Sequence, residues 1–124
     1  MSGNNILIDP NIALHLFSGN KTIAEALEGA TIHVSFITEM ELLGFPLISI
    51  KEQNQVKNFL SECIVLDLNN DIKTKAIYLR KKYKLKLPDA IIAASSIYLD
   101  IPLFPADSGM KKVKELNLAF FEEK

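Results

Sequence analysis

An uncharged stretch in the C-terminal half constrains the fold more than any other feature. Residues 90–98 contain no charged side chain and are apolar on nearly every face of a helix. Pro88 stands just before them, and proline is favoured at the first position of a helix. Asp89 then falls in the first turn, where free N–H groups and the helix dipole favour a carboxylate. The sequence therefore predicts a buried central helix with an acid at its start.

Short apolar runs alternate with amphipathic segments along the rest of the chain. We expect strands at residues 5–9, 31–36, 64–68 and 102–106, with a fifth edge strand at 118–121. Alternating strands and helices imply a mostly parallel sheet with helices on both faces. The predicted fold is therefore α/β: a three-layer α/β/α arrangement around a four- to five-stranded sheet. At 124 residues, we expect one domain spanning 1–124.

Local signals place several helix ends. Ser49 and Glu52 have the spacing of a capping box, which predicts a helix start at Ser49. Asn69 or Asn70 is expected to cap the next helix. Gly19 is expected to end the first helix of the chain.

Charge and cysteine content limit the class of protein. The net charge is −1, so contact with nucleic acid requires a local basic patch. The single cysteine, Cys63, falls on an apolar helical face, so we interpret it as a core residue of a cytoplasmic protein. No apolar run approaches the ~20 residues of a membrane helix, and the polar N-terminus is unlike a signal peptide. We therefore expect no membrane partner.

Four acids stand in comparable places relative to the predicted elements: Asp9, Glu41, Asp89 and Asp107. One ends the first strand, one directly follows the fourth strand, one lies a turn into the helix after the second strand, and one begins the central helix. Ligands of open α/β sheets bind at the carboxyl ends of the strands, so the topology allows all four to reach one edge. The spacing does not fix the distances between them.

A cluster of oxygen ligands without histidine or cysteine suits Mg²⁺ or Mn²⁺ better than zinc. Packed carboxylates raise one another's pKa unless a cation neutralises them, and phosphodiester hydrolysis commonly uses such a site. Each acid also has a structural alternative. Asp9 can cap a helix, Glu41 can complete a capping box with Thr38, Asp89 can complement a dipole, and Asp107 can belong to a turn.

Four segments resemble, in order, the four motifs of the PIN-domain ribonucleases. They are ILIDPN (6–11), SFITEMEL (35–42), LPDAIIAA (87–94) and LFPAD (103–107). The compact chain is similar to the VapC toxins of bacterial toxin–antitoxin pairs.

The resemblance implies a metal-dependent endoribonuclease. It implies that Asp9, Glu41, Asp89 and Asp107 are the catalytic residues and hold Mg²⁺ or Mn²⁺, which activates water against an RNA phosphate. By the same match, Asn11 is a polar neighbour that orients Asp9, or else a residue that satisfies the first helix turn. The resemblance also implies a small antitoxin partner and a homodimer.

The chain departs from the family pattern at three positions near these acids. Pro10 replaces a usual hydroxyl residue, Pro105 replaces a Thr or Ser, and Gly109 replaces an additional acid. Each of the two prolines removes a hydrogen-bond donor beside the site. An alternative function is therefore a PIN-fold module that binds RNA or protein with weakened catalysis. A phosphoacceptor receiver domain fits less well, because only one acid follows the first strand.

A basic run leads into the central helix. We expect Arg80, Lys82, Lys84 and Lys86 to bind the RNA backbone, unless they form only a solvated helix end. Lys111, Lys112 and Lys114 form a second candidate patch.

Overall fold

A parallel four-stranded sheet forms the centre of the protein. The computed structural model describes residues 4–46, 49–104 and 109–118. The strands are β1 (Asn4–Ile8), β2 (Ala30–Ser35), β3 (Ile64–Leu66) and β4 (Leu103–Phe104). They lie in the order β3-β2-β1-β4, and every pair is parallel.

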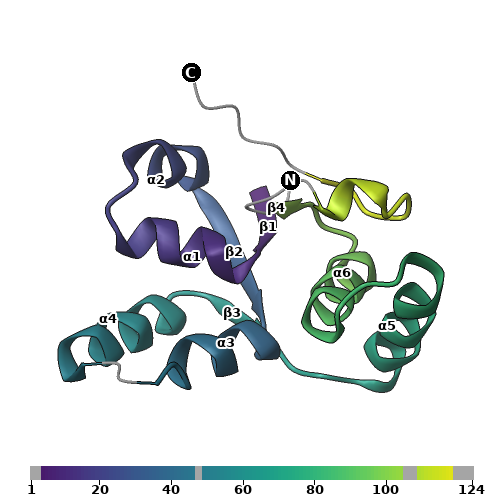
Figure 1. Ribbon diagram of the computed structural model, residues 1–124. Coiled ribbons are helices and arrows are strands. Elements are labelled where there is room, and N and C mark those ends of the chain that lie inside the picture. The colour runs from purple at the N-terminus through teal and green to yellow at the C-terminus, as the bar shows by residue number, and fades with distance from the viewer. Residues whose placement is uncertain (1–3, 47–48, 105–108, 119–124) are drawn as a thin grey trace.

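Helices cover both faces of this sheet (Figure 1). The described residues form α1 (Pro10–Phe17), α2 (Lys21–Leu27), α3 (Phe36–Leu43), α4 (Ile50–Ser61), α5 (Asn70–Tyr83), α6 (Leu87–Leu99) and a 3₁₀ helix, η1 (Gly109–Lys112). In Figure 1, α1 to α4 lie on one side of the strands and α5 and α6 on the other. The predicted three-layer α/β/α fold is confirmed.

The strands feed two separate apolar cores because successive side chains point to opposite faces of a sheet. Leu7 packs into the core formed with α5 and α6, while Ile8 packs into the core formed with α1, α2 and α4. The predicted central helix is α6, which is buried at seven consecutive positions, 90–96. Its lack of charge is therefore explained by its position against the sheet.

The expected helix signals largely hold. Ser49 and Glu52 form the capping box of α4, and the side chain of Asn69 caps α5. Gly19 follows the end of α1 with a φ of +87°, a conformation that glycine adopts without strain. The start of α6 was predicted one residue late: Leu87 is its first residue and Pro88 its second.

The strand predictions need adjustment at their ends. β3 ends at Leu66, two residues earlier than expected. β4 starts at Leu103, one residue later, and its expected residues 105 and 106 lie outside the described part. Leu118 forms an isolated parallel bridge with Leu103, while residues 119–121 of the expected fifth strand are not among those described.

Two further observations concern the expected absence of a membrane helix and the role of the single cysteine. No helix in the described ranges is both long and apolar enough to cross a membrane. Cys63 lies just beyond α4, where burial raises the pKa of its thiol to about 11. A neutral, half-buried thiol of this kind is unreactive.

Candidate active site

Asp9 stands at the junction of β1 and α1. It is only 8% exposed, and its Oδ1 accepts a hydrogen bond of 2.8 Å from the backbone N–H of Asn11. This bond caps α1, so the structural interpretation of Asp9 is correct. It also fixes the direction of the carboxylate at the carboxyl edge of the sheet. The backbone of Asn11 thus orients Asp9.

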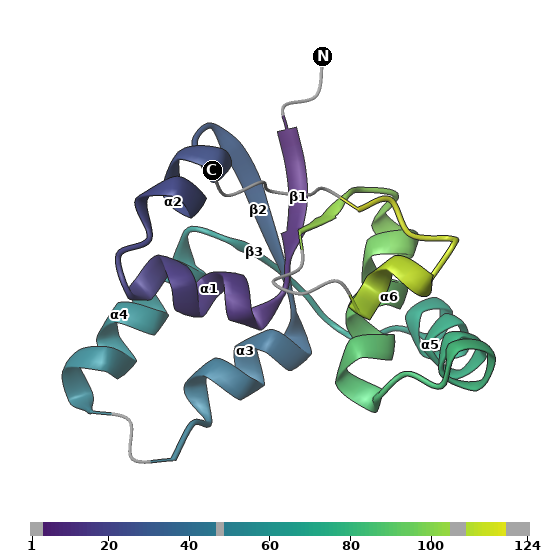
Figure 2. The same cartoon turned by 45° about the horizontal axis from the view of Figure 1, so that its top comes forward.

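Glu41 comes from α3, which starts directly after β2 without an intervening loop. The side chain of Ser35 caps this helix by accepting a hydrogen bond of 3.2 Å from the N–H of Ile37. The expected capping box of Thr38 and Glu41 is therefore wrong, because Thr38 is already the third residue of the helix. In Figure 2 the starts of α1 and α3 meet at the ends of β1 and β2.

Asp89 is the third residue of α6, at the end of the helix that carries the positive dipole. Lys86 precedes the helix and provides no side-chain capping bond to the described residues. The acid is partly exposed, unlike the seven residues that follow it. The apolar remainder of the helix anchors it, so Asp89 is presented from a rigid element.

The three described acids, Asp9, Glu41 and Asp89, line one pocket of about 580 Å³. Burial raises the pKa of Glu41, and the negative charge of Asp89 raises it further. The carboxyl groups of Glu41 and Asp89 are therefore close enough to repel each other. A bound cation would remove this repulsion.

The residues present fit a hard cation in their chemistry but form only part of a site. Three carboxylates without histidine or cysteine are the donor set that Mg²⁺ and Mn²⁺ prefer. Across residues 4–46, 49–104 and 109–118, no group of three or more His, Cys, Asp or Glu is placed to hold a metal ion. Asp107, Pro105 and the turn expected before Gly109 fall outside these ranges. The backbone N–H of Asp9 donates to the carbonyl of Phe104, three residues before Asp107, at 3.2 Å.

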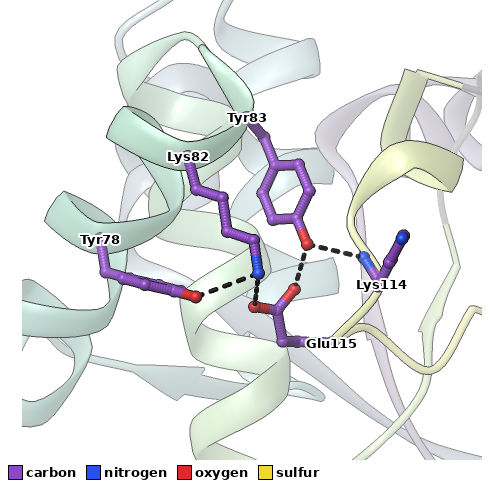
Figure 3. Close-up of polar contacts among 5 residues, drawn as sticks. All are labelled: Tyr78, Lys82, Tyr83, Lys114 and Glu115. Atoms are coloured by element: carbon purple, nitrogen blue, oxygen red, sulfur yellow. Dashed lines mark hydrogen bonds and ion pairs between the residues drawn. The ribbon is translucent and has the colours of Figure 1, made fainter.

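Part of the basic run is engaged within the protein (Figure 3). Lys82 forms an ion pair of 3.2 Å with Glu115 and also donates to the hydroxyl of Tyr78. Tyr83 donates to Glu115 and accepts from the backbone N–H of Lys114. Chiefly through the Tyr83 bond, the pKa of Glu115 falls to about 2. These contacts fasten the segment after η1 to the end of α5.

Two of the remaining cations of the run, Lys84 and Lys86, are closer to Asp89 in the sequence than Lys82 is. Arg80 donates from Nε to the carbonyl of buried Leu85, which fixes the turn between α5 and α6. Lys84 holds a left-handed conformation in this turn, and Lys86 immediately precedes α6. Both are exposed a few residues before Asp89. They remain candidates for RNA contact.

Comparison with known families identifies the chain. The profile of the PIN domain matches residues 6–116. The chain belongs to the PIN-domain family. No curated protein shows significant sequence similarity to it.

Solved structures with this PIN fold include several toxin–antitoxin assemblies. A chain of a toxin–antitoxin complex from Klebsiella pneumoniae is 30% identical, with a TM-score of 0.79 over 90% of this chain and 94% of that one. A chain of VapBC2 from Rickettsia felis, bound to a promoter DNA fragment, is 23% identical, with a TM-score of 0.82 over 95% and 99%. A chain of VapBC-1 from nontypeable Haemophilus influenzae is 20% identical, with a TM-score of 0.81 over 94% and 97%. The last two show likeness of fold alone.

Sequence reasoning missed the apolar wall of the pocket in this PIN domain. Beside the acids, the pocket is lined by Leu14, Phe17, Met40, Phe45, Val56 and Ile92. Leu14, Met40 and Phe45 are more than half exposed, at 52%, 61% and 66%. A signal existed at Phe45, a large apolar residue set between Gly44 and Pro46 where no helix could bury it.

Proposed function

We propose that this PIN domain is a metal-dependent endoribonuclease that acts as the toxin of a toxin–antitoxin pair. One observation carries the proposal: Asp9, Glu41 and Asp89, from three separate elements, line a single pocket at the carboxyl edge of the sheet. The match to the PIN domain over residues 6–116 supports the assignment to nucleic-acid hydrolysis.

Each acid has a defined part in this proposal. Asp9, Glu41, Asp89 and Asp107 would hold Mg²⁺ or Mn²⁺. When bound, the cation lowers the pKa of the attacking water and stabilises the leaving oxygen of the phosphodiester. Asp9 is kept in place by the Asn11 N–H, and Asp89 is fixed by the buried body of α6. Glu41 is exposed and repelled by Asp89, so it is the carboxylate most free to adjust.

The RNA backbone would be bound by exposed cations next to the pocket. Lys84 and Lys86 suit this role, because both precede Asp89 in a turn that Arg80 fixes. Lys82 contributes less, since Glu115 already neutralises it. The net charge of −1 makes such a local arrangement necessary.

The antitoxin would cover the apolar wall of the same pocket. Leu14, Met40 and Phe45 expose apolar surface beside the acids, and a protein chain laid there would block access to them. Similarity to a chain of a toxin–antitoxin complex at 30% identity supports such a partner. The cytoplasm, where RNA is accessible, is the proposed location.

A homodimer belongs to the same proposal. Leu68, Ile77 and Leu87 are about half exposed and line a second groove beside α5, which a second copy would cover. Sedimentation of the isolated protein tests this directly, and a monomer at micromolar concentration would exclude it.

The alternative is a PIN-fold binding module with weakened catalysis. Pro10 favours it, because Pro10 is the first residue of α1 and offers no hydroxyl beside Asp9. The described residues also form no three-ligand cluster as they stand. Such a module would bind RNA or a protein partner without turnover.

An Asp89→Asn variant tests the proposed function. Asparagine keeps the shape of the residue but removes the charge that attracts the cation. We expect the wild type, freed of any antitoxin, to cleave RNA only with Mg²⁺ or Mn²⁺, and the variant to lose cleavage and bind Mn²⁺ more weakly in calorimetry. Its melting temperature without metal should stay level or rise, because relief of repulsion with Glu41 offsets the lost dipole interaction.

The matched control is Asp100→Asn, at the opposite end of the same helix. Asp100 is exposed and left-handed, a conformation that asparagine also adopts readily. This variant should cleave RNA and bind Mn²⁺ as the wild type does. Cleavage that survives Asp89→Asn, or that persists in EDTA, contradicts the proposed function. A wild type that binds Mn²⁺ and RNA without cleavage supports the binding module instead.

A further inference from the structure

One buried hydroxyl of α3, the helix that carries Glu41, lacks a partner among the described residues. Thr38 is fully buried, and its Oγ1 forms no hydrogen bond with any described residue. The buried serines of α6 differ: Ser95 donates to the carbonyl of Ile91 at 2.7 Å, and Ser96 to that of Ile101 at 2.6 Å. Buried polar groups are nearly always paired, so an unpaired one needs an explanation.

The position of Thr38 ties it to the acids. The register of β1 and β2 pairs Leu7 with His33, and two further residues bring Asp9 level with Ser35. Thr38 lies three residues beyond Ser35 in α3, and Glu41 three residues beyond Thr38. Residues three apart share one face of a helix. Thr38 therefore lies on this face of α3 between Ser35, which is level with Asp9, and Glu41.

Helix geometry directs the Glu41 side chain toward Thr38. Side chains in a helix lean back toward its N-terminus and cover the residues three and four positions earlier. For Glu41 these positions are Thr38 and Ile37. The Thr38 hydroxyl is thus the nearest polar side chain one turn below the carboxylate on its own helix.

The two groups form no hydrogen bond with each other in the described state. Glu41 is exposed, and its carboxylate lies close enough to Asp89 for the two negative charges to repel each other. A cation held by these acids would offset this repulsion and favour a position of the Glu41 carboxylate nearer Thr38. A carboxylate bound to a metal normally keeps a second hydrogen bond that fixes its orientation.

We infer that Thr38 is a positioning residue of the pocket, whose hydroxyl donates a hydrogen bond to the Glu41 carboxylate when a divalent cation is bound. The inference rests on the proposed function, since it needs the acids to bind the cation. Thr38 itself touches neither the cation nor the substrate. Its hydroxyl stays unpaired until the cation arrives, so part of the binding free energy comes from satisfying it.

The experiment measures Mn²⁺ affinity and metal-free stability in matched variants. Thr38→Val removes only the hydroxyl at nearly constant volume, and Thr38→Ser keeps the hydroxyl while removing the methyl group. We expect Thr38→Val to raise the Kd for Mn²⁺ about 10- to 100-fold. Its urea midpoint in EDTA should stay level or rise, because an unpaired buried hydroxyl is gone. Thr38→Ser should bind Mn²⁺ nearly as the wild type does.

Ser96→Ala serves as the control, because it removes a buried hydroxyl that already has a partner far along α6. It should lower the urea midpoint and leave the Kd for Mn²⁺ unchanged. If Thr38→Val does not fold, Thr38→Ala and Thr38→Ser form the replacement pair, since they differ only in the hydroxyl.

Three results would overturn the inference. A Thr38→Val protein that binds Mn²⁺ as tightly as the wild type shows that the hydroxyl positions nothing, and the proposed function then stands without it. Equal weakening by valine and serine assigns the effect to packing. A wild type that binds no Mn²⁺ removes both this inference and the metal site of the proposed function.

Discussion

Asp9 combines two roles that substitution can separate. It caps α1 through the 2.8 Å bond from Asn11, and it lines the acid pocket. Asp9→Asn keeps a side-chain oxygen that can accept the Asn11 N–H but removes the negative charge. Asp9→Ala removes both. The pair therefore distinguishes a helix cap from a cation ligand.

The size of each effect follows from these contacts. Loss of a helix cap costs about 0.5–2 kcal/mol, and asparagine caps as well as aspartate does. Loss of a charge near a helix start costs about 0.3–1 kcal/mol. We therefore expect the free energy of unfolding of Asp9→Asn to lie within about 1 kcal/mol of the wild-type value. Asp9→Ala should be about 1 kcal/mol less stable than Asp9→Asn.

Cation binding should respond to charge alone. Both variants lose one of the acids that line the pocket, so the Kd for Mn²⁺ should rise at least about tenfold in each, or roughly 1.4 kcal/mol. Urea unfolding in EDTA gives the stabilities, and calorimetry gives the affinities. Asn20→Ala is the control, because Asn20 caps α2 by accepting from Ile23 at 3.0 Å and lies outside the pocket. It should lose about 1 kcal/mol of stability and bind Mn²⁺ normally.

Two results would refute this reasoning. Wild-type Mn²⁺ affinity in both Asp9 variants means that Asp9 is a helix cap only. If Asp9→Asn and Asp9→Ala lower the free energy of unfolding by the same amount, the hydrogen bond from Asn11 contributes little to stability. The loss would then come from the negative charge of Asp9, which the folded pocket would need for its structure.

Two further predictions concern charge around the pocket. The pKa of Glu41 is raised in the folded protein, so the metal-free folded state binds a proton at Glu41 more tightly than the unfolded state does. The contribution of Glu41 to the free energy of unfolding should therefore fall as the pH rises from about 4.3, the usual pKa of a glutamate, through the raised pKa of the folded state. Glu41→Gln should remove this fall, and urea midpoints measured in EDTA between pH 4 and pH 7 check it. If the variant shows the same dependence of urea midpoint on pH as the wild type, the prediction is contradicted. Replacing Lys84 and Lys86 with Gln should weaken RNA binding and flatten its dependence on salt, whereas the same change at exposed Lys51 and Lys57 of α4 should do neither. Equal effects of the two pairs in a salt titration would mean that binding follows net charge alone.

The sequence predicted much of the fold because local signals agreed with burial. An uncharged helix could only be central, and α6 is buried at 90–96. Helix caps are local: α4 is capped by Ser49 with Glu52, and α5 by Asn69. These caps do not depend on where the two helices pack, so they could be predicted without the tertiary structure. Strand ends were less predictable, because a strand stops where its neighbours stop. β4 pairs with β1 over two residues in the described part, which no local pattern in residues 102–106 reveals.

The candidate site divides in the same way. The types and order of Asp9, Glu41, Asp89 and Asp107 were evident in the sequence, and they indicated oxygen-ligand chemistry at the strand ends. Only the tertiary structure showed that the first three line one pocket, since parallel strand order decides which ends meet. Asp107 lies beyond the described residues, so its place beside them remains a prediction.

The tertiary structure was also needed to show which cations of the basic run are paired with an acid. Residues 80–86 read as one continuous patch, yet Lys82 pairs with Glu115, which is 33 residues away in the chain. Lys84 and Lys86 sit in the turn fixed by Arg80 and Leu85. Residue type and helical period are local properties, so the sequence determined the elements and the candidate acids. Which charges are paired, and which hydroxyl is left without a partner, depends on contacts between distant segments, and these only the folded chain decides.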